Sequence, residues 1–154
     1  MATHRYQARS GWSGSTGAGY DNYGRAHTAE IKPVEGQLIL SSDPAFLGDP
    51  GLYNPEQLLL VAASSCQLLS FLAVAARARI DVIAYEDDAE AIMPEGEKPV
   101  RITEIHLRPR ITVRGAPSQA RIEALVETAH RECFIANSLT AHIRVSPKVE
   151  YSPS

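Results

Sequence analysis

Apolar residues are concentrated in one segment, Asn54–Arg79, which also contains one of the two cysteines, Cys66. Its start predicts a helix: Asn54 can accept a hydrogen bond from a first-turn amide, Pro55 suits the first helical position, and Glu56 favours the positive end of the helix dipole. Beyond the first turn, the apolar positions leave no wide polar face, which predicts burial on nearly all sides. The rest of the chain is therefore expected to surround this helix.

A membrane-spanning helix is the alternative interpretation of this segment. Polar residues interrupt it repeatedly, at Glu56, Ser64, Ser65, Gln67 and Ser70. The uninterrupted apolar pieces are shorter than the ~20 residues that a bilayer requires. We therefore expect a buried helix and no membrane partner.

Period-two alternation of apolar and polar residues predicts strands on both sides of the helix. The expected strands cover 4–12, 25–31 and 37–41 before it, and 81–93, 100–114 and 141–151 after it. A phase change in the fifth of these predicts a bulge near Thr103 or Glu104. Pro109 cannot donate to a ladder, so it predicts a bend or a sheet edge at that point.

A second helix is predicted to begin at Pro117 and Ser118 and to end at the second cysteine, Cys133. Apolar residues recur in it at helical spacing, namely Ile122, Leu125, Val126 and Ala129. The order of elements predicts a single α+β domain, residues 1–154, in which two helices pack against antiparallel sheet. Because a chain this short cannot fully enclose one apolar helix, we also expect a dimer.

Charge and composition exclude several classes of protein. The net charge of −3 is spread along the chain without a basic stripe, which argues against nucleic acid as a partner. Two cysteines and an N-terminus without an apolar signal segment predict a cytoplasmic protein with reduced thiols. The histidines are too scattered for a metal site, and the acidic row Glu86, Asp88 and Glu90 forms an open line and not a cage.

Taken alone, Cys66 has two interpretations. A cysteine among alanines and leucines is usually an inert, small hydrophobic residue. A reactive thiol needs a nearby cation or a helix N-terminus to lower its pKa. The choice depends on whether the chain supplies such a group.

The sequence resembles the family of osmotically inducible protein C and organic hydroperoxide resistance protein (OsmC/Ohr). The resemblance rests on the Asn-Pro-Glu-Gln-Leu-Leu motif at 54–59, on Cys66 ten residues after the glutamate, and on Cys133 sixty-seven residues further along. The segments 23–27 and 133–139 fit the same family. In all, the resemblance extends over residues 4–151.

This resemblance implies an intertwined homodimer with the sheet wrapped around two central helices and active sites at the interface. It implies a thiol peroxidase that reduces organic hydroperoxides, and hydrogen peroxide less well, without a metal, flavin or other cofactor. Cys66 would attack the peroxide, Cys133 would resolve the sulfenic acid as a disulfide, and an external thiol or dithiol would reduce it. Arg25 would stabilise the thiolate, and Glu56 would hold Arg25 through a bidentate ion pair.

Helix geometry restricts this arrangement. Glu56 and Cys66 are ten residues apart, hence ~15 Å along a straight helix and ~80° around it. One arginine cannot serve both within one helix. Either the helix breaks near Ser64 and Ser65, or the other subunit supplies Arg25 and Glu56 across a two-fold axis, which the apolar character of the helix favours.

The chain departs from the family pattern in two places. Phe134 and Ile135 follow the second cysteine where much of the family has Pro-Val, and residues 43–53 form an insertion before the helix. Both changes bear on the substrate pocket. The alternatives to a peroxidase are a non-catalytic dimer that binds a small ligand and a redox sensor whose disulfide signals to a partner.

Overall fold

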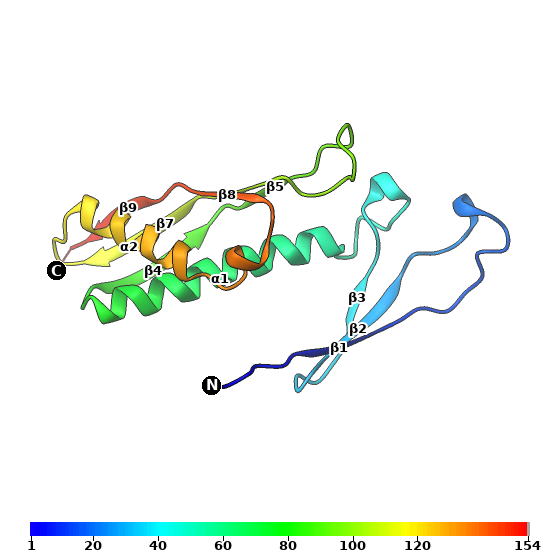
Figure 1. The fold of residues 1–154 in the computed structure, drawn as a ribbon, viewed down its shortest axis with the longest axis horizontal. Coiled ribbons are helices and arrows are strands. Elements are labelled where there is room, and N and C mark those ends of the chain that lie inside the picture. Colours follow the sequence, from blue (N-terminus) through cyan, green and yellow to red (C-terminus); the bar gives the residue numbers. More distant parts are fainter. Residues whose placement is uncertain (154) are drawn as a thin grey trace. The chain divides into compact units, whose positions relative to one another are not determined.

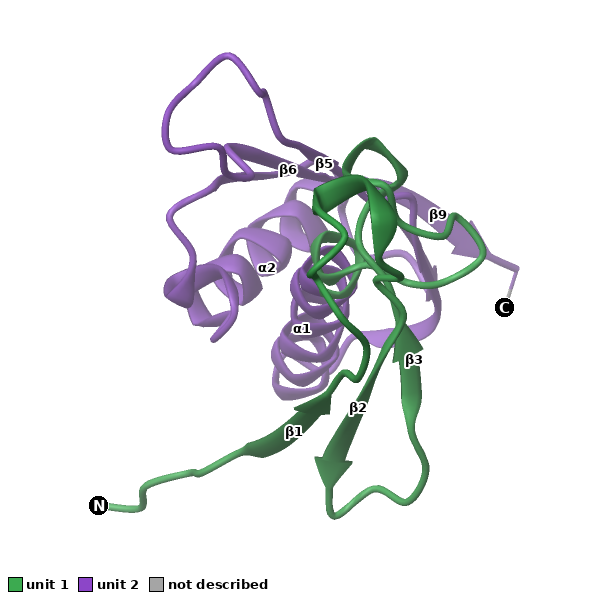
Figure 2. Cartoon of the chain, turned by 90° about the vertical axis from the view of Figure 1, so that its right-hand side faces the viewer, with its two compact units in different colours: residues 1–58 green, residues 59–154 purple. Residues whose placement is uncertain are grey.

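The computed structural model describes residues 1–153, and the chain divides into two compact units, Met1–Leu58 and a second unit from Leu59 onward (Figure 2). The long helix α1 (Pro55–Arg77) begins in the first unit and continues in the second. The elements confirm the predicted α+β class (Figure 1). That residues 1–154 form one domain stays a prediction.

The first unit contains one antiparallel sheet of three strands in the order β1-β2-β3. They are β1 (Gln7–Gly11), β2 (His27–Lys32) and β3 (Leu38–Leu40). The three strands predicted before the helix are therefore confirmed, each with shorter bounds. Every residue of β1 is exposed within this chain, although its alternation of apolar and polar residues is typical of a half-buried strand.

The start of α1 is fixed by a reciprocal cap, of which the sequence predicted the hydrogen bond accepted by Asn54. The Gln57 N–H donates to Asn54 Oδ1 at 2.8 Å, and the Asn54 N–H donates to Gln57 Oε1 at 3.0 Å. The helix then runs unbroken to Arg77. The break considered near Ser64 and Ser65 does not occur.

Burial of α1 is narrower than its composition predicted. Its buried face consists of Ala63, Gln67, Phe71, Val74 and Ala75. Val61 and Leu69, by contrast, are 61% and 62% exposed. By length and composition alone α1 could cross a membrane, but a core helix has the same properties, and this one packs along its buried face into the second unit.

The second unit contains two mixed sheets of three strands each. One is ordered β4-β7-β9, with bounds Asp81–Asp87, Pro109–Arg114 and Lys148–Ser152. The other is ordered β5-β6-β8, with bounds Glu90–Ile92, Glu104–Leu107 and His142–Val145. β8 and β9 run parallel to β6 and β7, because the helix α2 (Gln119–Glu132) carries the chain back across before β8 begins. The sheets are thus mixed and not purely antiparallel.

Each strand predicted after the helix is split in two. Asp88 and Ala89 separate β4 from β5, Arg108 separates β6 from β7, and Ser146 and Pro147 separate β8 from β9. Each break moves the chain from one sheet to the other.

The bulge predicted near Thr103 or Glu104 is wrong, and the prediction for Pro109 is half right. The register shift falls between Val82 and Ala84 in β4, while residues 100–103 precede β6 and lie outside it. Pro109 marks a bend, as expected, but it opens β7, the central strand of its sheet. The first position of a strand tolerates proline, so an edge is not required.

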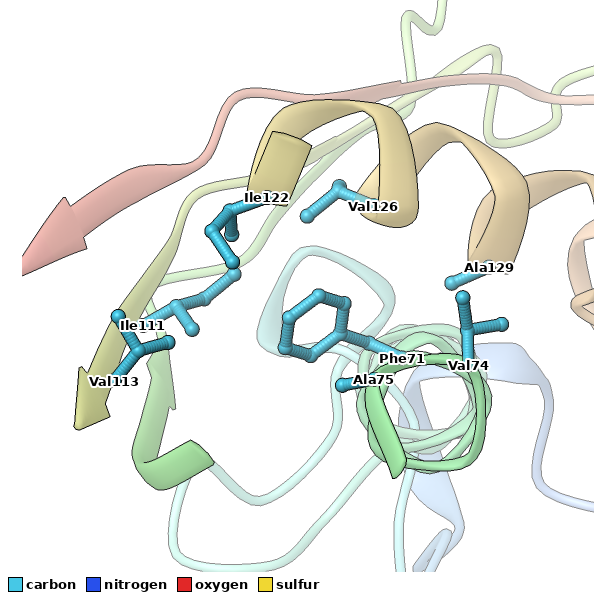
Figure 3. Close-up of a cluster of buried hydrophobic side chains, with 8 residues drawn as sticks. All are labelled: Phe71, Val74, Ala75, Ile111, Val113, Ile122, Val126 and Ala129. Atoms are coloured by element: carbon cyan, nitrogen blue, oxygen red, sulfur yellow. The ribbon is translucent and has the colours of Figure 1, made fainter. Parts of the chain in front are cut away.

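The main core joins α1, α2 and β7 (Figure 3). Its eight buried side chains are Phe71, Val74 and Ala75 of α1, Ile111 and Val113 of β7, and Ile122, Val126 and Ala129 of α2. The apolar positions predicted for the second helix are therefore confirmed as its inner face. This packing holds the end of α2 against the middle of α1.

Truncation of Phe71, which has no exposed surface, tests this core. We expect Phe71→Ala to lower the free energy of unfolding by about 3–5 kcal/mol, because it leaves a cavity between the helices and β7. Glu127→Ala, at an exposed position of α2, should change it by less than about 0.5 kcal/mol. Urea denaturation followed by circular dichroism measures both, and equal losses would contradict the assigned core.

Candidate dithiol site

The structure brings Cys66 and Cys133 together as free thiols. Cys66 lies in the middle of α1, and Cys133 is the C-terminal cap of α2, 1% exposed. The two are close enough for the Cys133 thiol to hydrogen-bond to Cys66. Beside them, Gln67 Nε2 donates to the Val126 carbonyl at 3.3 Å and ties the two helices together.

Two opposing effects set the pKa of Cys66. Burial alone would raise it, but hydrogen bonds to the sulfur outweigh burial, so the net pKa of Cys66 is lowered. The donors are the backbone N–H of Ile135, the Cys133 thiol, the backbone N–H of Phe134 and the Ser70 hydroxyl. The site therefore favours a thiolate at Cys66.

The pKa of Cys133 is shifted upward, in the opposite direction to that of Cys66. Burial and the neighbouring Cys66 together raise the pKa of Cys133 to about 11, although a backbone hydrogen bond from Ala136 partly offsets them. The Ala136 N–H lies 3.4 Å from Cys133 Sγ. Of the two thiols, Cys66 is the one that ionises, and Cys133 keeps its proton and donates.

The two backbone donors to Cys66, Phe134 and Ile135, lie in the turn that follows α2, which ends in a short 3-10 segment, Ala136–Ser138. The Ser138 hydroxyl donates to the Phe134 carbonyl at 2.7 Å, and Asn137 Nδ2 donates to the Arg131 carbonyl at 3.0 Å. These bonds fix the turn while its N–H groups face the sulfur. Sequence reasoning missed these donors because they are backbone groups, although Asn137 and Ser138, four and five residues after Cys133, are a turn signal.

A cavity of about 520 Å³ opens beside Cys66, and we call it the dithiol cavity. Its lining combines apolar, polar and charged side chains, namely Cys66, Leu69, Ser70, Ala73, Arg77, Glu132, Phe134 and Asn137. Arg77 and Glu132 form an ion pair at 2.6 Å, which links the last turn of α1 to that of α2. A small molecule in this cavity would contact the sulfur directly.

Arg25 lies outside the strand that was predicted to contain it, and its role beside Cys66 stays a prediction. It precedes β2, and its guanidinium donates to the carbonyls of Tyr23 at 2.7 Å and Tyr20 at 2.6 Å. Its Cζ atom also lies 4.1 Å and 4.6 Å from the ring centroids of Tyr23 and Tyr20. Among the described residues 1–153 no ion pair joins Arg25 to Glu56, so the bidentate pair expected between them is absent within one chain.

Arg25 and Glu56 nevertheless line one cavity of about 340 Å³ in the first unit, the aromatic cavity. Its other walls include Trp12, Tyr23 and Phe46, and Trp12 Nε1 donates to the Gly24 carbonyl at 2.8 Å. Trp12, Tyr20 and Tyr23 form an accessible aromatic surface around Arg25, which no short motif marks, whereas Tyr85 packs against the core of the second unit.

The other histidines and the acidic row have neighbours that fit a structural role. His27 Nδ1 lies 2.8 Å from the Arg25 carbonyl, in keeping with a packing role beside Arg25. Burial, with His142 nearby, lowers the pKa of His130, which favours its neutral form. In the acidic row, Glu90 pairs with Arg108 at 2.9 Å and Glu86 with Arg110 at 3.6 Å.

The family model and the solved structures that this chain resembles agree on one protein family. A family model described as OsmC-like protein matches residues 48–148. An OsmC-like protein of unknown function from Vibrio cholerae has a TM-score of 0.83 at 29% identity, covering 96% of this chain and 99% of that one. No curated protein sequence matches significantly.

Two further solved structures share the fold. An organic hydroperoxide resistance protein OsmC from Legionella pneumophila has a TM-score of 0.70 at 20% identity, covering 97% of this chain and 99% of that one. An organic hydroperoxide resistance protein from Elizabethkingia anophelis has a TM-score of 0.72 at 18% identity, covering 98% and 99%.

The opposite shifts of the two thiols predict different pH profiles for alkylation. Cys66 should react with iodoacetamide with a midpoint below the 9.0 of an ordinary thiol, and Cys133 with a midpoint near 11. Cys133→Ala should raise the midpoint of Cys66, because one donor to its thiolate is lost. Mass spectrometry of peptides alkylated across the pH range measures each site, and a shared midpoint would contradict the assignment.

Proposed function

Because this chain belongs to the OsmC-like protein family, we propose that it is a cytoplasmic thiol-dependent peroxidase that reduces organic hydroperoxides, and hydrogen peroxide less well, in defence against oxidative or osmotic stress. The observation that carries the proposal is the pairing of a low-pKa Cys66 with a protonated Cys133 beside a cavity. A packing cysteine needs neither the donors nor the cavity.

In the first step the Cys66 thiolate attacks the terminal oxygen of the hydroperoxide. A sulfur–oxygen bond forms, the oxygen–oxygen bond breaks, and the alkoxide takes a proton from water to leave as an alcohol. Sulfur is thereby oxidised to sulfenic acid while the peroxide is reduced. The N–H groups of Phe134 and Ile135 hold the attacking sulfur in its ionised form.

In the second step Cys133 attacks the sulfenic sulfur, and water leaves with the Cys133 proton. The charge on Cys66 is one cause of the high pKa of Cys133. Conversion of Cys66 to a neutral sulfenic acid removes that charge, so Cys133 ionises more readily only after the peroxide has reacted. An external dithiol then reduces the Cys66–Cys133 disulfide and becomes a disulfide itself.

We also propose that Arg25 and Glu56 act in the active site from the second subunit of a homodimer. The unbroken α1 separates Glu56 from Cys66 by ~15 Å and ~80°, so the group that serves Cys66 comes from another copy. The exposed apolar side chains of α1 outside the dithiol cavity, Val61 and Leu72, are surface that a second copy would cover. The hydrogen-bond donors to the Cys66 thiolate are neutral groups, and Arg25 of the partner subunit would bring a cation toward it.

Hydroperoxide consumption with a dithiol reductant tests the peroxidase. Cys66→Ser should lower kcat/KM for cumene hydroperoxide by about a thousandfold or more, because the nucleophile is lost. Cys133→Ser should leave a sulfenic acid at Cys66 that dimedone traps. A wild-type protein that shows no activity with several dithiols would contradict the proposal. A Cys66–Cys133 disulfide that forms but is not turned over would favour the redox sensor.

Mixing two inactive variants tests the composite site. We expect Cys66→Ser and Arg25→Ala homodimers each to be nearly inactive, and subunit exchange between them to restore part of the activity. Each mixed dimer then contains one intact combination of Cys66 from one subunit and Arg25 from the other. No recovery after verified exchange, or a sedimentation mass of one chain, would rule this arrangement out.

A further inference from the structure

We propose that Phe134 determines substrate specificity, and that its ring and Leu69 form a binding surface for the organic group of aryl hydroperoxides. The inference rests on the proposed peroxidase function and adds the class of substrate that this site prefers. Phe134 directly follows Cys133 in the chain.

The backbone of Phe134 is fixed relative to the reactive sulfur. Its N–H is one of the donors to Cys66, and its carbonyl accepts from the Ser138 hydroxyl at 2.7 Å. The turn is closed further by the Asn137 N–H, which donates to the Cys133 carbonyl at 3.0 Å. Any change in the Phe134 side chain therefore acts at a constant place beside the thiolate.

The side chain of Phe134, in contrast, is 81% exposed. It lines the dithiol cavity together with Leu69, which is 62% exposed and follows Cys66 by three residues on the same face of α1. Two large apolar side chains left in water next to a nucleophile gain free energy when an apolar group covers them. An aromatic ring adds a preference for aromatic partners.

The cavity has room for this arrangement. Its volume of about 520 Å³ falls within the range of about 300–1,000 Å³ typical of small-molecule sites. A phenyl-bearing hydroperoxide can rest on Phe134 and Leu69 while its terminal oxygen meets Cys66. Hydrogen peroxide has no group to make that contact, so it gains nothing from the ring.

Proline at position 134 would remove both the aromatic ring and the backbone N–H that donates to Cys66, because proline has neither group. Phe134→Ala removes the ring and keeps the N–H, whereas Phe134→Pro removes both. The two substitutions therefore separate substrate binding from stabilisation of the thiolate. Phe134→Leu keeps apolar bulk and loses only aromatic character.

The experiment compares kcat/KM for cumene hydroperoxide, tert-butyl hydroperoxide and hydrogen peroxide. In Phe134→Ala we expect the ratio of cumene hydroperoxide to hydrogen peroxide to fall about tenfold, and in Leu69→Ala to fall in the same direction. The same ratio in Phe134→Leu should lie between the ratios of the wild type and of Phe134→Ala. Tyr151→Ala, which removes an exposed aromatic from β9 away from the cavity, should keep the wild-type ratio.

A second readout excludes a merely structural effect. The alkylation midpoint of Cys66 should stay low in Phe134→Ala and rise in Phe134→Pro, because only the latter loses a donor. An unchanged ratio in an active Phe134→Ala enzyme, or an equal loss for all three peroxides, would overturn the specificity assignment alone. A wild-type protein without peroxidase activity would overturn the proposed function and this inference with it.

Discussion

The arrangement of the second unit depends on the contact between the end of α2 and the middle of α1. The half-buried sulfur of Cys66 on α1 is partly desolvated, which by itself would raise its pKa and disfavour the thiolate. The turn after α2 supplies backbone donors to that sulfur, and the core of Phe71, Val126 and Ala129 holds the two helices at the distance these bonds need. Packing and chemistry are therefore coupled, because the side chains that stabilise the unit also set the pKa of Cys66.

The long helix and its cap could be predicted from the sequence because their signals are local. Asn54 and Gln57 lie within one turn of each other, and the side chain of each accepts a hydrogen bond from the backbone N–H of the other. The inner face of α2 could also be predicted from the sequence, because apolar residues at helical spacing indicate which face is buried. The pairing of Cys66 with Cys133 followed from a family motif, and the structure supplies its physical basis.

Other features could not be read from the chain because they depend on distant partners. The splits at Asp88, Arg108 and Ser146 arise where a strand passes from one sheet to the other, and a period-two pattern continues through such a point almost unchanged. The narrow burial of α1 has a different cause. Composition reports how apolar a helix is, but not whether its own chain or another chain covers it.

The turn after α2 has a consequence for the oxidised protein. Its N–H groups at Phe134 and Ile135 are aimed at a negatively charged sulfur, and a sulfur in a disulfide is a much weaker acceptor. Oxidation thus takes away the partner of these amides, while Cys66 stays fixed in a rigid helix. We expect the backbone order of residues 134–136 to follow the redox state, so that an external reductant meets a looser segment over the bond it must reach.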